Sequence, residues 1–137
     1  MQAKKTVLIT DLDNTLFDWV QLWHDCFVAM MDEVEKISGV PFQQLKPEIR
    51  KIHQKHGTSE YSFLLEEMPT LRKKFVNQQL REVFRPAIEA YGSVRRQNLR
   101  LYPTVGETLL KIKGAGAVIV GYTESMAFYS NYRVVSV

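Results

Sequence analysis

The chain has 137 residues, the size of one ordinary domain, and hydrophobic residues make up 45% of it, enough to form a core. Lys and Arg number 18 against 15 Asp and Glu, and the resulting net charge of +3 is too small to indicate a nucleic-acid partner. The single cysteine, Cys26, excludes an intrachain disulfide, and no apolar run reaches membrane-spanning length. We therefore expect a soluble, cytoplasmic protein with no signal peptide and no membrane segment.

The first predicted element is a β-strand over residues 6–10, a short apolar run rich in β-branched residues. Such a run is typical of a strand buried on both faces of a parallel sheet. Asp11 and Asp13 follow it, one residue apart. Because side chains alternate along extended backbone, both carboxylates should point to one side while Leu12 points into the protein. Two hard oxygen donors suit Mg²⁺, so the sequence predicts a magnesium site here. The alternative is an acidic loop in which Asp13 or Asn14 forms an Asx-turn.

A helical stretch follows, from about residue 20 to residue 99. The expected helices span Trp19–Ser38, Phe42–Gly57, Glu60–Glu67 and Thr70–Phe84. Pro69 should end the third of these helices, and Pro86 should break or kink the fourth. His53 and His56 could share a helix face, but no Glu or Cys completes a metal-binding motif with them, so we expect a solvated polar face.

The last predicted elements are a short helix over residues 107–113 and a second buried strand over residues 117–121. Thr123 follows that strand, as Asp11 follows the first. A hydroxyl donor at the carboxyl end of a neighbouring parallel strand can bind an anion, together with the backbone amides that begin the next helix. Thr123 or Ser125 as an ordinary helix cap is compatible with this role.

Two motifs carry a resemblance to a known family. The run Asp11-Leu12-Asp13-Asn14-Thr15-Leu16 resembles the DxDxT signature of the haloacid dehalogenase-like (HAD) hydrolases, and the second strand with Thr123 resembles that family's second motif. The resemblance implies an α/β fold with a HAD-like, Rossmann-like parallel sheet, incomplete here. Residues 1–18 and 100–137 would form the partial core, and residues 19–99 an inserted, all-helical cap that closes over the acids and selects the substrate.

The chemistry implied by the resemblance is Mg²⁺-dependent hydrolysis of a small phosphorylated metabolite. Asp11 would form an aspartyl-phosphate, and Asp13 would act as general acid and then as general base. Mg²⁺ would bridge Asp11, the Asp13 carbonyl and the phosphoryl group. Thr15 would shape the loop and, with Thr123, Glu124 and Ser125, would bind the substrate. The second Asp favours a phosphatase over a dehalogenase, because displacement of halide needs no acid.

The sequence also departs from the family. No residue matches the family's third motif, which carries a Lys, or its fourth, which carries further acids. We therefore expect a truncated or altered form of a longer protein, with little or no activity as given. Two parallel strands alone leave exposed edges, which predict self-association. A non-catalytic, scaffold-like interaction domain and a haloacid dehalogenase-like hydrolase remain the alternatives.

Overall fold

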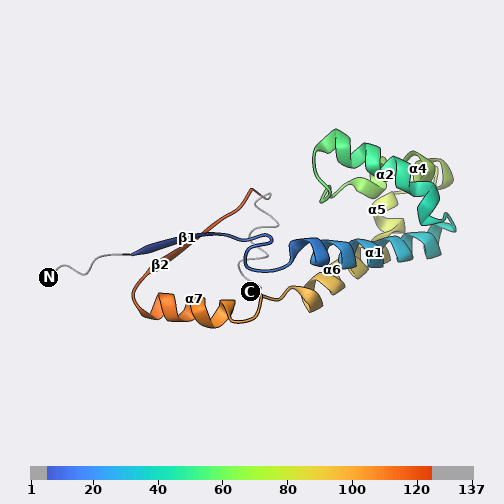
Figure 1. Ribbon diagram of the computed structural model, residues 1–137. Coiled ribbons are helices and arrows are strands. Elements are labelled where there is room, and N and C mark those ends of the chain that lie inside the picture. The colour runs from blue at the N-terminus through green and yellow to red at the C-terminus, as the bar shows by residue number, and fades with distance from the viewer. Residues whose placement is uncertain (1–5, 125–137) are drawn as a thin grey trace. The chain divides into compact units, whose positions relative to one another are not determined.

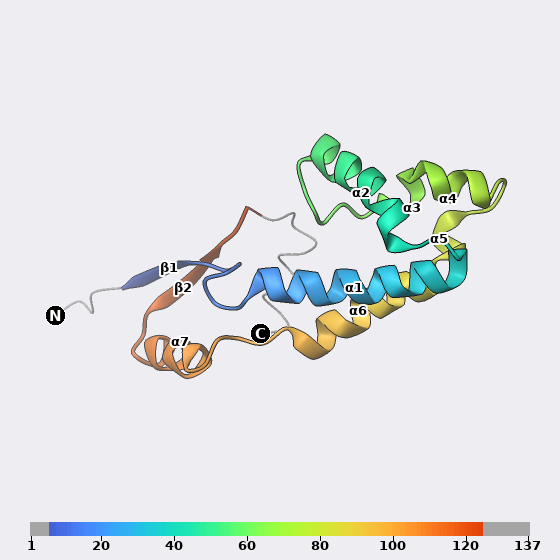
Figure 2. The same ribbon diagram turned by 45° about the vertical axis from the view of Figure 1, so that its right-hand side comes forward.

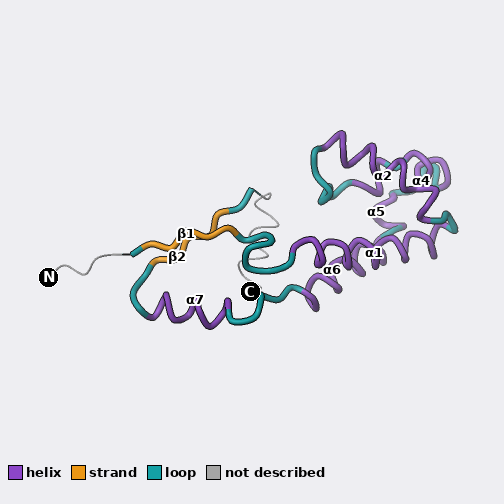
Figure 3. Tube along the Cα trace, in the orientation of Figure 1, coloured by secondary structure: helices purple, strands orange, loops and turns teal. Residues whose placement is uncertain are grey.

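The computed structural model of the protein describes residues 6–124. It is a mixed α/β structure, mostly helical, with two parallel strands that form one small sheet (Figures 1 and 3). The described part divides into two compact units: residues 6–24 with 95–124, and residues 25–94. The first unit holds the sheet, and the second is entirely helical.

The sheet pairs β1 (Val7–Asp11) with β2 (Val118–Tyr122) in parallel, with Val7 opposite Val118 and Asp11 opposite Tyr122. The helix α7 (Val105–Gly114) precedes β2 and packs against it. Both strands lie where the apolar runs predict them, and their parallel pairing is confirmed.

The expectation that these strands are buried on both faces is wrong. Exposure alternates along β1: Val7 and Ile9 are exposed while Leu8 and Thr10 are half-buried. The physical reason is that, among the described residues, the sheet has only two strands, and one of its faces is left without a covering layer. Neither outer edge pairs with another strand within residues 6–124, so edge-mediated self-association stays a prediction.

The long helix α1 (Trp19–Ser38) has the predicted bounds and is continuous across the boundary between the units. The boundaries between the units lie at residues 24/25 and 94/95, inside the range 19–99 expected for the insertion. The first boundary differs from the expected one because the first turns of α1 belong to the unit that holds the sheet. Cys26, the single cysteine of the chain, is buried on this helix. No helix in the described part of the chain is long and apolar enough to cross a membrane.

Five helices follow α1 in the helical unit, and α6 runs back alongside α1 in both views (Figures 1 and 2). Their bounds are α2 Phe42–His56, α3 Leu64–Glu67, α4 Pro69–Lys74, α5 Leu80–Val83 and α6 Arg85–Asn98. Gly57 ends α2 in the left-handed conformation (φ 65°), which favours glycine.

The expected helices after α2 are partly wrong. Pro69 is the first residue of α4 and does not only end α3. Proline is tolerated at the first helical position because the N–H that it lacks would have no intrahelical partner there. The expected helix over residues 70–84 is two short helices, α4 and α5, separated at Asn77, which has φ 60°. The helical chain is interrupted at Phe84, between α5 and α6, so the expected break before Pro86 is confirmed, and Pro86 itself lies in the first turn of α6.

The core of the helical unit is formed by side chains that α1 to α6 bury. Phe84 is completely buried, and its ring meets Phe75 edge-on with 5.3 Å between centroids. Glu48 on α2 accepts hydrogen bonds from the Thr70 hydroxyl (2.6 Å) and from the Thr70 backbone N–H (3.2 Å). A carboxylate of one helix thus caps the first turn of another, because α4 has no side-chain cap of its own.

His53 and His56 do not form the expected solvated face. Both are half-buried. His53 meets Phe27 edge-on, and burial lowers the pKa of its imidazole. The His56 ring stacks on Tyr61 with centroids 3.6 Å apart. The sequence spacing showed only that the two could share a helix face, whereas α1 and the 60–67 segment bring apolar and aromatic partners to them.

Glu67 is the centre of a polar cluster in the helical unit. It accepts a hydrogen bond from the Tyr61 hydroxyl at 2.6 Å and pairs with Lys55 at 2.9 Å, and His56 Nε2 lies 3.1 Å from its carboxylate. The hydrogen bonds from Tyr61, Lys55 and His56 lower the pKa of Glu67 from 4.5 to about 2.

The depressed pKa of Glu67 predicts a specific acid response. A carboxylate whose folded pKa lies below its unfolded value contributes stability that is present above pH 4.5 and is lost as the pH falls towards 2. Glu67→Gln should therefore lower the thermal midpoint at neutral pH, and its difference from the wild type should vanish near pH 2. Glu33→Gln, which breaks the surface pair with Lys36, is the matched control and should change little. Equal pH profiles for the wild type and Glu67→Gln would contradict this account.

Candidate functional site

The predicted acids lie at the carboxyl end of the sheet. Asp11 is the last residue of β1 and stands opposite Tyr122, the last residue of β2. Thr123 is therefore the first residue beyond the neighbouring parallel strand, at the same end of the sheet as Asp13. In open α/β sheets ligands bind at this end. The structure thus brings the two predicted motifs together.

A tight loop follows Asp11 and reverses the chain. The Leu12 carbonyl accepts hydrogen bonds from the backbone N–H of Thr15 (3.2 Å) and of Leu16 (2.9 Å). Leu12 itself is buried, and it packs so closely on Gly121 of β2 that a Cβ there would lie 3.2 Å from the Leu12 side chain. Exposure alternates from exposed Asp11 through buried Leu12 to half-buried Asp13, as the sequence predicts.

Thr15 holds the first carboxylate. Its hydroxyl donates a hydrogen bond to Oδ2 of Asp11 at 3.0 Å. One carboxylate oxygen of Asp11 is thus held from within the loop. Thr15 was predicted to shape the loop, and this contact is a physical means by which it orients Asp11.

Asp13 lies deeper than Asp11. The residue is half-buried, its Oδ1 atom is buried, and its backbone forms an isolated bridge with Phe17. Phe17 is only 2% exposed, so the loop is anchored at its far end by a core side chain. The backbone N–H of Tyr102 donates to the Leu16 carbonyl at 2.8 Å, which ties the returning chain to the same loop.

Asn14 is a residue of this loop to which sequence reasoning gave no functional role. It adopts the left-handed conformation with φ 57°, which asparagine tolerates better than most residues. Its side-chain oxygen accepts hydrogen bonds from the backbone N–H of Trp19 (2.9 Å) and of Val20 (3.3 Å). Asp18 caps the same helix end by accepting from the Gln21 N–H at 2.9 Å. Asn14 therefore fastens the acidic loop to the start of α1, and the signal was an asparagine in a reversing loop shortly before a helix.

Asn14→Ala should detach this loop from α1. The substitution removes the acceptor for two backbone N–H groups. It also places alanine at positive φ, where alanine has no side-chain hydrogen bond to offset the backbone strain. The free energy of unfolding should fall by about 1–2 kcal/mol. Hydrogen exchange at the Trp19 and Val20 amides should become faster. Asn14→Asp retains the acceptor and is the matched control. Unchanged exchange at both amides in Asn14→Ala would show that the cap is unimportant.

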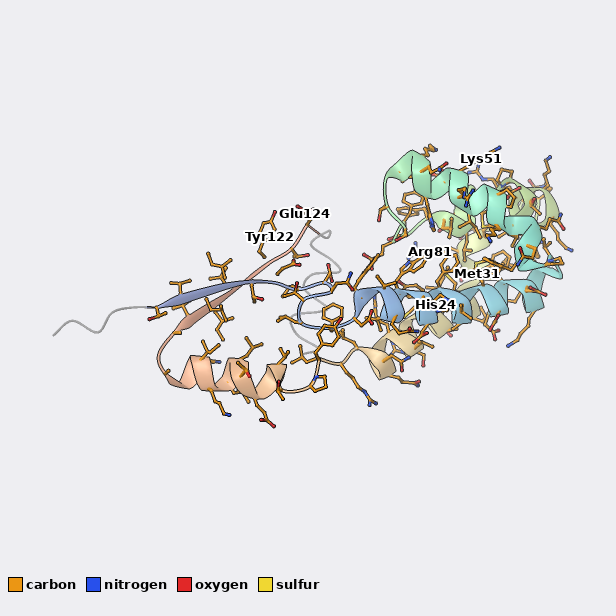
Figure 4. All side chains as sticks on the ribbon, viewed as in Figure 1. His24, Met31, Lys51, Arg81, Tyr122 and Glu124 are labelled. Carbon is orange, nitrogen blue, oxygen red and sulfur yellow. The ribbon has the colours of Figure 1, made fainter. Side chains whose placement is uncertain are left out.

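The substrate-binding positions are placed only in part. Thr123 is half-buried directly beyond β2, and Glu124 is exposed. Tyr122 and Glu124 extend from the carboxyl end of β2 in Figure 4. Ser125 lies outside the described residues.

The donor set at this end of the sheet fits Mg²⁺. Within residues 6–124 there is no group of three or more His, Cys, Asp or Glu side chains arranged to hold a metal ion. Mg²⁺ needs only one or two carboxylates, and completes its octahedral shell with water and substrate phosphate oxygens. Asp11 and Asp13 carry carboxylate and carbonyl oxygens, which are donors of the type that Mg²⁺ prefers.

Neither the known family models nor the curated proteins include a match to the chain. The HAD resemblance therefore rests on the two sequence motifs alone.

Proposed function

We propose that the chain is a Mg²⁺-dependent phosphatase-type domain of the HAD-like kind that acts on a small phosphorylated metabolite in the cytoplasm. The observation that carries the proposal is the register of the sheet: Asp11 and Asp13 follow one strand, and Thr123 follows its parallel neighbour at the same end. A nucleophile, an acid–base group and a hydroxyl donor are the parts that a phosphoryl transfer through a covalent intermediate requires.

The residues have distinct roles in this reaction. Asp11 uses Oδ1 to attack the phosphorus atom, while Thr15 holds Oδ2, and the bond from phosphorus to the substrate oxygen breaks. Asp13 gives its proton to that leaving oxygen. Asp13 then takes a proton from water as the water attacks the aspartyl-phosphate, which releases inorganic phosphate and restores Asp11. Thr123 donates its hydroxyl to a phosphoryl oxygen.

The Asp11 carboxylate and the Asp13 backbone carbonyl would hold the metal ion. When bound, Mg²⁺ supplies positive charge that offsets the repulsion between the carboxylate nucleophile and the phosphate. Because the described part of the chain has no further acidic or histidine group to complete the site, we expect the ion to bind weakly and turnover to be slow.

This proposal predicts a low, Mg²⁺-dependent rate with a generic aryl phosphate. The purified 137-residue chain should hydrolyse it slowly, and a chelator should remove that rate. Robust turnover would contradict the expected weakness of the site. Turnover that survives chelation would contradict the Mg²⁺ dependence.

A non-catalytic binding domain is the second candidate. The observation that favours it is the small donor set, which can hold a ligand without completing a reaction. An experiment with a phosphate analogue distinguishes this candidate from the phosphatase. A binding domain would bind the analogue at Asp11 but would not hydrolyse a phosphate ester. A dehalogenase-like hydrolase stays the weaker alternative because Asp13 has no task when halide leaves.

A further inference from the structure

One face of the sheet is apolar and open to solvent. Side chains that stand opposite each other in parallel strands project to the same face, and those of alternate residues share that face. The open face consists of Val7, Ile9, Val118, Val120 and Tyr122, which are 54%, 70%, 51%, 43% and 57% exposed. On the opposite face Leu8 and Ile119 are half-buried, so that face is more covered than the open face.

The open face is too large to be a scatter of single exposed residues. Its five large side chains are contiguous in the sheet register and form one apolar patch. The largest apolar patch on a protein surface is often functional. Four of the five residues are β-branched, with few side-chain rotamers to lose, so little conformational entropy opposes their burial.

The apolar, uncharged centre of the open face indicates the kind of partner that fits it. A two-fold contact brings a surface against an identical one, so the surface must be complementary to itself. The open face has no charged side chain at its centre, and two copies meet there without repulsion. Asp11 follows Val7 and Ile9 in the alternation and marks the carboxyl end of the face. If the strands of the two copies run in opposite directions, the two Asp11 carboxylates lie at opposite ends of the contact.

We propose that the open face is the contact surface of a homodimer, in which two copies pack face to face with their strands running in opposite directions. Sheets pack in this way about 10 Å apart through interdigitating side chains. A standard interface buries about 800 Å² per partner and uses roughly 20–30 residues a side, and the open face has five large side chains, so the dimer is weak. The Tyr122 ring adds contact area, while its hydroxyl stays in water at the rim. This inference does not depend on the proposed hydrolysis.

Sedimentation of the full chain over a wide concentration range tests the proposal. The mass should rise from 15.9 kDa towards twice that value, with a dissociation constant on the order of micromolar to millimolar. Ile9→Lys should weaken the dimer at least about tenfold, because each dimer would have to bury two charges. Val76→Lys in the helical unit, at an exposed valine (63%), is the matched control and should leave the association unchanged.

A second variant keeps the test valid if lysine disturbs the strand. Ile9→Thr retains a β-branched residue and every backbone hydrogen bond but removes apolar surface. Face-to-face packing should weaken in this variant, whereas association through the sheet edges, which uses the backbone, should persist. A chain that stays monomeric at all concentrations, because another part of it covers the face, would overturn the proposal. A dimer that both Ile9 variants leave intact would overturn it as well.

Discussion

Replacing Asp11 by asparagine is expected to abolish covalent labelling of the chain by a phosphoryl donor. Acetyl phosphate with Mg²⁺ should add one phosphoryl group to the wild-type chain, detected by intact mass after an acid quench. In Asp11→Asn the amide lacks the carboxylate nucleophile, so labelling should fall by on the order of a thousandfold or more. The asparagine can still accept the Thr15 hydrogen bond, so the loop should keep its shape.

The control for this experiment is Asp32→Asn, which removes the same charge from an exposed position on α1. It should be labelled like the wild type. Labelling of Asp11→Asn at the wild-type rate would show that Asp11 is not the nucleophile, whether or not the metal ion still binds.

The second large effect is expected from Phe84→Ala in the helical unit. Phe84 is completely buried and packs edge-on against Phe75, so truncation leaves a cavity among side chains from several short helices. A loss of about 3–5 kcal/mol is expected, a large share of the roughly 5–15 kcal/mol that stabilises a domain. Urea unfolding followed by circular dichroism measures it.

Phe63→Ala is the matched control, because Phe63 is 51% exposed and its truncation removes a ring without opening a buried cavity. Its effect should be below about 1 kcal/mol. Equal losses in the two variants would mean that Phe84 does not occupy the core of the helical unit.

Much of the architecture could be read from local patterns. The broad apolar stripe of residues 19–38 predicted α1 to the residue, and both apolar runs became paired parallel strands. The site followed from these elements: once β1 and β2 are parallel neighbours, the positions of Asp11 and Thr123 at one end of the sheet are a consequence of register.

The failures have a common physical origin in contacts between distant residues. The composition of the first strand could not show that one face of the sheet would lack a cover. The separation of α4 from α5 around Asn77 is a turn that helical periodicity does not reveal. Glu67 and Lys55 are twelve residues apart, and Thr70 and Glu48 are twenty-two apart. Such pairs form only after the helices have packed.

The central claim is that the Asp11 carboxylate and the Asp13 backbone carbonyl together bind Mg²⁺ at the end of the sheet. Titration of the wild-type chain with Mg²⁺, followed by the NMR signals of the backbone amides of residues 11–15 and 123, tests it most directly. We predict saturable shifts at these amides that Asp11→Asn weakens at least about tenfold. Asp13→Asn keeps the backbone carbonyl and should have a smaller effect, and the Glu67 amide in the helical unit should not shift. Shifts that never saturate, or that Asp11→Asn leaves unchanged, would contradict the account.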